Sequence, residues 1–448
     1  MSIAFIHLSD IHFGQEKGGT LIIHNDAKER LVEDVARAVR SLPEGIASGI
    51  IISGDIAYAG KHDEYADAGQ WLDRVANAAG CAITDIQVVP GNHDIDRDRI
   101  SGATAWMLQE IADKGEPELD KFLGSQMDRE LLYARFSAYQ PFAEAYGSPL
   151  DNQGGFAGNR IVQLAPGRSL RFIGMNTALT CAKKDQEGRL LLGARQRVLP
   201  LTPGEELVVI AHHPLKWLQD SEDAQKYLSN RARVFITGHE HSPSVKVCPI
   251  EDGCDLMLLQ AGATVPPTAD ETFTYTYNIL EFEWDAETDA LIVIVHPRAW
   301  SEDKKDFRAD EDRLEEMQPR YLLGCPNFRQ AVQVPSVTTT KTADTMQPAV
   351  TVPVVQEAGV IEERKEPSMP AKYSLLRLRF FRDLTSAQRL RVLVDLNALP
   401  DDWRDLLTHS IEVQILDSLQ RTNRLDDLEA AIKKIEAEHK KQEGKEHG

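Results

Sequence analysis

Five short polar motifs, each directly after an apolar run, constrain the fold of this 448-residue chain more than any other feature. The motifs are Asp10-Ile11-His12, Gly54-Asp55, Gly91-Asn92-His93-Asp94, His212-His213-Pro214 and Gly238-His239-Glu240-His241. The apolar runs before them cover residues 3–8, 49–52, 86–89, 207–210 and 234–236. Runs of this kind are typical of buried strands, and α/β proteins place ligands at the carboxyl ends of strands. The sequence therefore predicts one site to which five strand ends contribute oxygen and nitrogen ligands.

The order of the apolar runs predicts an α/β fold in which two sheets pack together. Residues 1–95 alternate strand-like runs with amphipathic segments at 27–39 and 64–79, which indicates a β-α-β-α-β order. From residue 160 onward the runs follow one another closely and predict a second sheet. Its expected strands cover residues 161–164, 169–175, 207–210, 234–236, 257–260, 275–282 and 290–295, with a helix at 190–199. We assign this first domain to residues 1–330.

Two segments depart from the sandwich pattern. Residues 97–147 have helical periodicity and predict a helical cap inserted beside the site. Its aromatic residues are expected to pack on the sheet rather than to stack nucleic-acid bases. Residues 331–371 are rich in proline and threonine and predict a flexible linker.

The chain beyond the linker, residues 372–448, predicts a small all-α domain. Thr385 to Gln388 fits a capping box, and an apolar stripe follows it. Further helices are expected after Asp401-Asp402, through residues 411–419, and from Asp426 into the charged tail. Such a domain suits binding to a protein partner or self-association.

Charge and cysteine content limit the classes of function. A formal net charge of −20 disfavours a broad basic surface that grips duplex DNA, although bound cations would offset this field locally. Five scattered cysteines suit reduced thiols in the cytoplasm. The N-terminus enters a strand directly, and no apolar run approaches the ~20 residues of a spanning helix, so we expect no membrane association.

The residue types of the five motifs point to a dinuclear metal site. Two divalent metals about 3.5–4 Å apart need a bridging carboxylate, neutral nitrogen donors and hard oxygen donors. Asp10 and His12 alternate along an extended segment, as do His239 and His241, so each pair can point one way. Asp55 follows a glycine that permits close approach and is the natural bridge. Each motif alone would be an ordinary turn, and the residues do not decide between His212 and His213.

Together, the motifs over residues 1 to about 300 resemble the calcineurin-like metallophosphoesterase superfamily. The resemblance implies two sheets flanked by helices, an αββα sandwich, with the metals at the carboxyl ends of the strands. It assigns Asp10, His12 and His241 to one metal, Asn92, His212 and His239 to the other, and Asp55 to both. His212 is implied rather than His213, because the family's ligand lies two residues before the proline. His93 would be the catalytic imidazole, oriented by Asp94.

The resemblance also implies a reaction, hydrolysis of a phosphoric ester by metal-bound hydroxide. The Gly-Asn-His-Asp and Gly-His-Glu-His motifs look most like the phosphodiesterase branch of the superfamily. Manganese is the expected metal, although such ligands also suit iron and zinc. The alternatives are a cyclic-nucleotide or other small-molecule phosphodiesterase, a phosphoprotein phosphatase, and a non-enzymatic scaffold.

The C-terminal helices resemble the effector-associated and death-like adaptor domains of bacterial conflict systems. The resemblance lies in Leu384-Thr385, Ile415-Leu416 and the stretch from Leu419 to Ala431. It implies a nuclease or nucleotide-directed effector of antiviral defence, recruited or activated through this domain.

Overall fold

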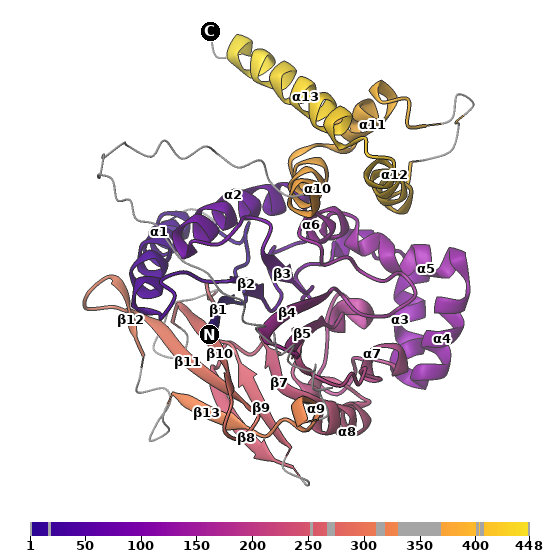
Figure 1. Ribbon diagram of the computed structural model, residues 1–448. Helices are drawn as coiled ribbons and strands as arrows, with labels where there is room; N and C mark the ends of the chain where they lie inside the picture. Colours follow the sequence, from indigo (N-terminus) through magenta and orange to yellow (C-terminus); the bar gives the residue numbers. More distant parts are fainter. Residues whose placement is uncertain are drawn as a thin grey trace, which may run out of the picture.

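The computed structural model describes residues 2–16, 19–250, 254–266, 274–310, 319–329, 369–399, 403 and 407–446. Over these residues, two mixed β-sheets pack face to face, helices flank them, and a group of helices from the C-terminal part lies against one side (Figure 1). The predicted two-sheet α/β sandwich and the all-α C-terminal region are confirmed.

The first sheet is built around three parallel strands that precede polar motifs. They are β1 (Ser2–Leu8), β2 (Gly49–Ile52) and β3 (Ile86–Val88). On the other side of β1, antiparallel strands complete the sheet, namely β10 (Thr276–Asp285), β11 (Ala290–Ser301), β12 (Asp306–Ala309) and β13 (Arg320–Leu323). The prediction that the strands at 275–282 and 290–295 belong to the second sheet is wrong, because β10 pairs with β1 and β11 pairs with β10. Because β1, β2 and β3 are parallel, their carboxyl ends lie at the same edge.

The second sheet has a parallel centre, β5-β6-β7-β9, with an antiparallel strand at each end. Its strands are β4 (Asn159–Ala165), β5 (Arg168–Gly174), β6 (Glu205–Ile210), β7 (Ala232–Thr237), β8 (Ser244–Pro249) and β9 (Asp255–Gln260). The motifs that follow β6 and β7 therefore also lie at one edge.

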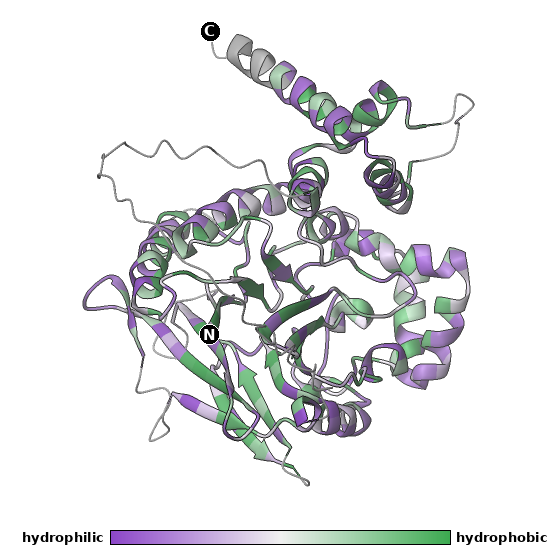
Figure 2. Cartoon of the chain, viewed as in Figure 1, coloured by the Kyte–Doolittle hydropathy of each residue, from purple (hydrophilic) through white to green (hydrophobic). Residues whose placement is uncertain are grey.

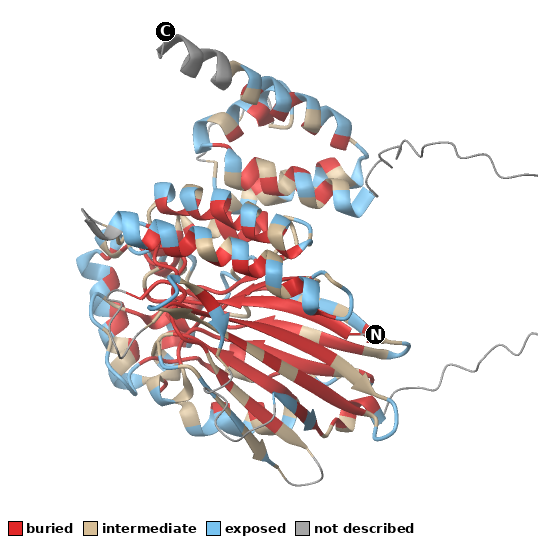
Figure 3. Cartoon of the chain, turned by 90° about the vertical axis from the view of Figure 1, so that its left-hand side faces the viewer, coloured by how far each residue is buried: buried red, intermediate tan, exposed pale blue. Residues whose placement is uncertain are grey.

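Apolar residues fill the space between the sheets and explain the continuous apolar runs of the sequence. In β1, Ile3 and Phe5 face the second sheet, whereas Ile6 and Leu8 face the helices, so both faces are buried. The Phe5 ring lies 4.9 Å from Phe172 of β5 and 6.1 Å from Phe282 of β10, centroid to centroid. Figures 2 and 3 show these strands as hydrophobic and buried through most of their length.

Helices cover the outer faces of both sheets. On the first sheet lie α1 (Gly19–Ala38) and α2 (His62–Ala79), and on the second lies α8 (Ser221–Arg231) (Figure 1). The helix predicted at 190–199 is wrong in extent: only the short α7 (Ala194–Arg197) forms. Gly193 directly precedes this helix. Its φ of 79° lies outside the helical region, so the helix cannot continue through it.

The predicted helical insertion between β3 and β4 is present. It contains α3 (Gly102–Lys114), α4 (Glu116–Gly124), α5 (Gln126–Tyr133) and α6 (Tyr139–Ala145). Most of its aromatic residues are buried against the sandwich, namely Phe122, Tyr133, Phe136, Tyr139 and Phe142. Only Trp106 is largely exposed, so packing rather than base stacking accounts for these rings.

The described C-terminal helices are α10 (Met369–Leu378), α11 (Ser386–Asp395), α12 (His409–Arg421) and α13 (Leu425–Glu446). A π-helical turn, η8 (Arg379–Asp383), continues α10, and the predicted capping box at Thr385 is confirmed. The predicted linker lies almost wholly outside the described residues, as does the start of the helix predicted after Asp401-Asp402. Within the described residues, every helix is too short or too polar to cross a membrane.

Candidate metal centre

The five polar motifs meet where the carboxyl ends of the two sheets approach each other. The Asp10 amide donates to Gly54 O at 3.0 Å, which joins the first two motifs. The Gly238 amide donates to His212 O at 2.9 Å, which joins the last two. A Cβ at Gly54 would lie 2.5 Å from His212 Nδ1, so only glycine lets the motifs of the two sheets approach this closely. The single site predicted from the sequence is thus assembled in space.

Backbone strain is concentrated in these motifs. Nine non-glycine residues of the described chain have a positive φ, and five of them belong to the motifs: Asp10, His12, Asp55, His239 and His241, with φ between 52° and 72°. Such conformations are uncommon for residues other than glycine and cluster at functional sites, where the surrounding structure holds them. We expected Asp10 and His12 to alternate along an extended segment; instead both turn into the left-handed region.

One group of candidate ligands comes from the first and last motifs. Asp10, His12 and His241 each offer a ligand atom, and these atoms lie within 4.8 Å of one another. His241 Nε2 is 3.2 Å from Asp10 Oδ1. The His12 ring is held by the carbonyl of Val265, which lies 3.4 Å from its Nδ1. This fixes the ring and leaves Nε2 facing Asp55.

Asp55 lies between this group and a second one. Its Oδ2 is 3.4 Å from His12 Nε2 and 3.2 Å from His212 Nε2. His212 Nε2 is in turn 3.2 Å from the side-chain oxygen of Asn92, and the His239 ring centroid is 5.1 Å from that of His212. One carboxylate therefore contacts ligand candidates from both halves of the site.

The structure distinguishes the two adjacent histidines. His212 Nδ1 bonds to the carbonyl of Ser53 at 2.9 Å, which leaves Nε2 among the ligand candidates. His213 lies within ligand distance of His212 and His239, but protein groups occupy both its ring nitrogens. Thr177 Oγ1 is 2.8 Å from its Nδ1 and Cys181 Sγ is 3.8 Å from its Nε2. This arrangement favours His212 as the ligand.

His93 lies beside the centre and is oriented by Tyr58. Its Nδ1 is 2.7 Å from the Tyr58 carbonyl, and its ring stacks on the Tyr58 ring with centroids 5.2 Å apart. Its backbone amide donates to Asp55 Oδ1 at 2.7 Å. The ring centroid of His93 is 5.0 Å from that of His12. Its imidazole can thus reach a group bound between the two halves of the site.

Asp94 has a different role from the one implied by the resemblance. Its carboxylate accepts hydrogen bonds from the amides of Ile56, Ala57 and Gly91 at 2.9–3.2 Å, and from the Tyr65 hydroxyl at 2.9 Å. The expectation that it orients the His93 ring is therefore corrected, because the Tyr58 carbonyl occupies that ring nitrogen. Asp94 instead ties together the two loops that carry Asp55 and Asn92.

Electrostatics of the site suit a bound cation. Burial would raise the pKa of the Asp10 and Asp55 carboxyl groups, but neighbouring histidines hold both below their usual range. Burial lowers the pKa of His93, and that of His239 to about 4. Burial would also lower the pKa of His212, but Asp55 outweighs it and raises that pKa to about 9. Two ionised carboxylates thus lie together away from water, which is costly unless cations pair with them.

The site residues that sequence reasoning missed include Ser53, Tyr58, Tyr65 and Val265. Ser53 and Tyr58 act through backbone carbonyls, which leave no trace in residue type. Tyr65 lies on α2 and reaches Asp94 only through the packing of that helix. Only Tyr58 could have been suggested by the sequence, because it lies three residues after the motif residue Asp55.

Comparisons with known proteins agree with this geometry. Residues 3–243 match the calcineurin-like phosphoesterase family, and residues 372–434 match the GTPase-associated adaptor domain. Both resemblances inferred from the sequence are confirmed. An uncharacterized metallophosphoesterase-like protein of Bacillus subtilis (strain 168), YydB, is 23% identical over 340 residues. That match covers 72% of this chain and 65% of the relative, so the chain spans less than two thirds of the relative's length.

Solved structures give more distant matches. Purple acid phosphatase PPD1 from yellow lupin seeds is 12% identical with a TM-score of 0.37, covering 72% of this chain and 54% of that one. The NAD nucleotidase of Haemophilus influenzae is 12% identical with a TM-score of 0.33, covering 71% and 56%. Similarities this low carry no argument about substrate.

Proposed function

Because this chain belongs to the calcineurin-like phosphoesterase family, we propose that it hydrolyses phosphodiester bonds with two divalent metal ions. The observation that carries the proposal is the position of Asp55, whose Oδ2 contacts His12 and His212 at 3.4 and 3.2 Å. A carboxylate shared by two groups of ligands is what a dinuclear site requires.

The seven clustered side chains fit such a pair of ions. We assign Asp10, His12 and His241 to one ion, Asn92, His212 and His239 to the other, and Asp55 to both. Bound cations would supply Lewis-acid activation of water and neutralise charge on the phosphoryl oxygens. The oxygen and nitrogen donors suit manganese, our first choice, and also iron or zinc.

The chain's own residues would position the ester and handle the proton of the leaving group. His93 is the proposed proton donor to the leaving oxygen. Burial lowers the pKa of His93, whereas Asp55 and the Tyr58 carbonyl favour its protonated form. With Nδ1 held on that carbonyl, Nε2 is the nitrogen that is left to donate. Asp94 keeps the His93 loop and the Asp55 loop in register through its bonds to Gly91 N and Ile56 N.

The proposed substrate is a nucleic acid or a nucleotide. We propose an effector of a bacterial defence system, and the match to an adaptor domain supports action through a protein partner or self-association. The net charge of −20 favours a second candidate, a phosphodiesterase for cyclic or other small nucleotides, because a polymer would meet a repulsive surface. A phosphoprotein phosphatase is the remaining catalytic alternative.

An activity panel on the full chain with manganese tests the proposal. The substrates are bis-p-nitrophenyl phosphate, single- and double-stranded DNA, RNA and cyclic nucleotides, given to wild type and to His93→Ala. We expect wild type to cleave a diester and the variant to lose about 10²- to 10⁴-fold in kcat, the usual contribution of a general acid. Cleavage of polymers selects the nuclease, and turnover of only small diesters selects the second candidate. No turnover of any diester by metal-loaded wild type would contradict the proposal.

A further inference from the structure

An ion pair joins the adaptor helices to the phosphoesterase domain. Arg382, in η8, has a side chain only 9% exposed. Its Nη1 and Nη2 donate to the two carboxylate oxygens of Asp73 on α2 at 2.6 and 2.9 Å, and Nη1 also donates to the Tyr146 hydroxyl at 3.1 Å. Bidentate arginine–carboxylate pairs are among the stronger and more specific polar contacts. The contact is therefore specific rather than incidental.

Other contacts extend this interface along α2 and α6. Glu144 of α6 lies 3.9 Å from Arg377 of α10 and 3.6 Å from His409 of α12, oxygen to nitrogen. On α2, a Cβ at Gly69 would lie 2.8 Å from Cδ of Arg382, so this glycine gives the arginine its space. Basic groups of the adaptor thus meet acidic groups of the phosphoesterase domain at a fitted surface.

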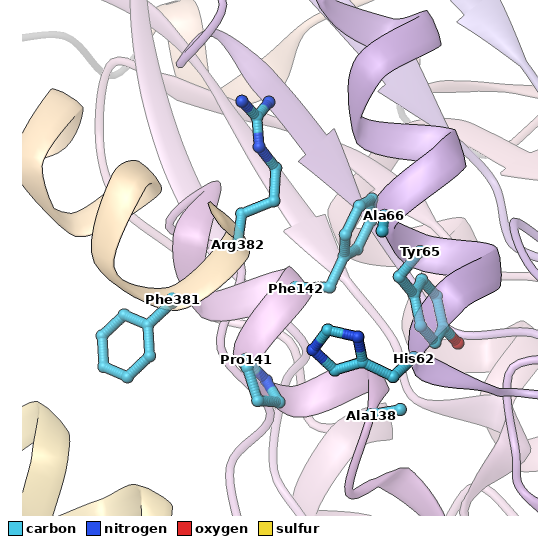
Figure 4. A pocket seen from close by; sticks show the side chains of 8 residues that line it. All are labelled: His62, Tyr65, Ala66, Ala138, Pro141, Phe142, Phe381 and Arg382. Carbon is cyan, nitrogen blue, oxygen red and sulfur yellow. The ribbon is translucent and has the colours of Figure 1, made fainter. Parts of the chain in front are cut away.

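A small pocket lies where η8 approaches α2 and α6 (Figure 4). Phe381 and Arg382 line it from the adaptor, and Tyr65 and Phe142 line it from the phosphoesterase domain. The Tyr65 and Phe142 rings contact each other with centroids 4.9 Å apart. Tyr65 is therefore one wall of the surface that receives the adaptor.

The other end of Tyr65 reaches the candidate metal centre. Its hydroxyl donates to Asp94 Oδ1 at 2.9 Å and lies 3.2 Å from the Asp94 carbonyl. Asp94 binds the amides of Ile56 and Gly91, which flank Asp55 and Asn92. A series of contacts thus runs from Arg382 of η8 through Tyr146, Phe142 and Tyr65 to Asp94, and from there to the loops that carry the proposed ligands.

We propose that docking of the adaptor on the α2–α6 face holds Tyr65 against Asp94 and so keeps the two ligand loops in their catalytic arrangement. The proposal rests on the phosphodiesterase function proposed above. Tyr65 is then a positioning residue, and a protein that binds the α10–η8 face of the adaptor must displace it from the phosphoesterase domain. Adaptor binding and turnover become coupled through this surface.

Charge reversal on the full chain tests the coupling. Arg382→Asp and Asp73→Arg each break the ion pair, and the double variant restores it with opposite polarity. Arg391→Ala is the matched control, because Arg391 pairs with Glu438 inside the adaptor. Thermal unfolding checks the fold of each variant, and Asp73→Asn is the milder change if a reversal does not fold.

Hydrogen exchange of backbone amides is the first readout, since it does not depend on activity. We expect each reversal to speed exchange in α6 and in residues 55–58 and 91–96 by about tenfold, within the usual range of coupling between sites. The double variant and Arg391→Ala should return to about the wild-type rates. The proposal is overturned if the reversals leave α6 protected, or if they expose α6 and leave residues 91–96 unchanged.

Kinetics on a small diester are the second readout. Undocking should lower kcat about tenfold with little change in KM, and Tyr65→Phe should do the same. Combining Tyr65→Phe with Arg382→Asp should cost little more than either change alone, because both act through one contact. Additive losses would overturn the assigned role of Tyr65. If wild type hydrolyses no diester, the proposed function fails, and the exchange rates still decide whether docking orders the loops.

Discussion

Asp55 is the residue on which the candidate centre depends. Its Oδ2 contacts His12 and His212, and its Oδ1 accepts the His93 amide at 2.7 Å. The residue is 2% exposed, and in the part of the chain that the structure describes, the carboxylates of Asp10 and Asp55 pair with histidines rather than with lysine or arginine. Buried carboxylates in a shell of imidazoles are costly for a protein without cations, so the site has the composition expected of a metal centre.

The two adjacent histidines are predicted to differ in their effect on activity. His212→Gln should lower kcat/KM more than about 10³-fold, because it removes a ligand next to Asp55. His213→Gln should lower kcat/KM by about 10- to 100-fold at most, since His213 bonds to Thr177 and Cys181 and only positions its neighbours in the site. Steady-state kinetics of the two variants, with bound metal measured in parallel, make the comparison. A larger loss in His213→Gln would assign the ligand role to His213 instead.

The sequence predicted which residues gather, but not every contact among them. The seven ligand candidates follow apolar strands, so their clustering could be inferred from strand polarity alone. Asp94 was misassigned because the family resemblance implied a side-chain partner, His93, whereas its actual partners are backbone amides and Tyr65. Such contacts depend on how α2 and the loops pack, which no local pattern records.

At the scale of elements, strands with a continuous apolar run were predictable, whereas three strands without such a run were not. The predicted helix at 190–199 shrank to four residues, and β8, β12 and β13 were missed. In β12, only Phe307 is buried, so the element has almost no pattern and is defined by pairing with β11. Edge strands of this kind are specified by their neighbours rather than by their own residues.

The contact of α12 with α6 should depend on pH. Burial would lower the pKa of His409, but the carboxylates of Glu144 and Glu412 raise it above the usual 6.5. Arg377 and Arg389 face the same two carboxylates, Arg377 near Glu144 and Arg389 near Glu412. Because the folded pKa is raised, the stabilising contribution of His409 is complete below about pH 6.5 and is lost as pH rises through the folded value.

Thermal unfolding between pH 6 and 8 measures this contribution. The unfolding temperature of wild type should fall relative to that of His409→Gln as the pH rises, because the variant lacks the titrating group. The buffer series should be run at constant ionic strength, since salt screens the ion pairs. Parallel pH profiles of the two proteins would show that His409 does not contribute in this way.

In the whole molecule, a polar interface joins the phosphoesterase sandwich to the adaptor helices. The sandwich places the candidate ligands at strand ends, and the adaptor contacts α2 and α6 through Asp73 and Glu144. The domain types could be recognised from the sequence, but the interface between them could not, because Asp73 and Arg382 are 309 residues apart. Interfaces between domains of one chain are commonly polar and exchangeable, which suits a regulatory contact.

Metal content is the most direct test of the central claim, that the five strand ends form a dinuclear centre bridged by Asp55. Wild type, Asp55→Asn and the surface control Asp113→Asn should be loaded with manganese, desalted and analysed by inductively coupled plasma mass spectrometry. We predict about two ions per chain in wild type and in the control, and fewer than about one in Asp55→Asn, because both ions lose a shared ligand. Retention of two ions by Asp55→Asn, or of none by wild type, would contradict the account.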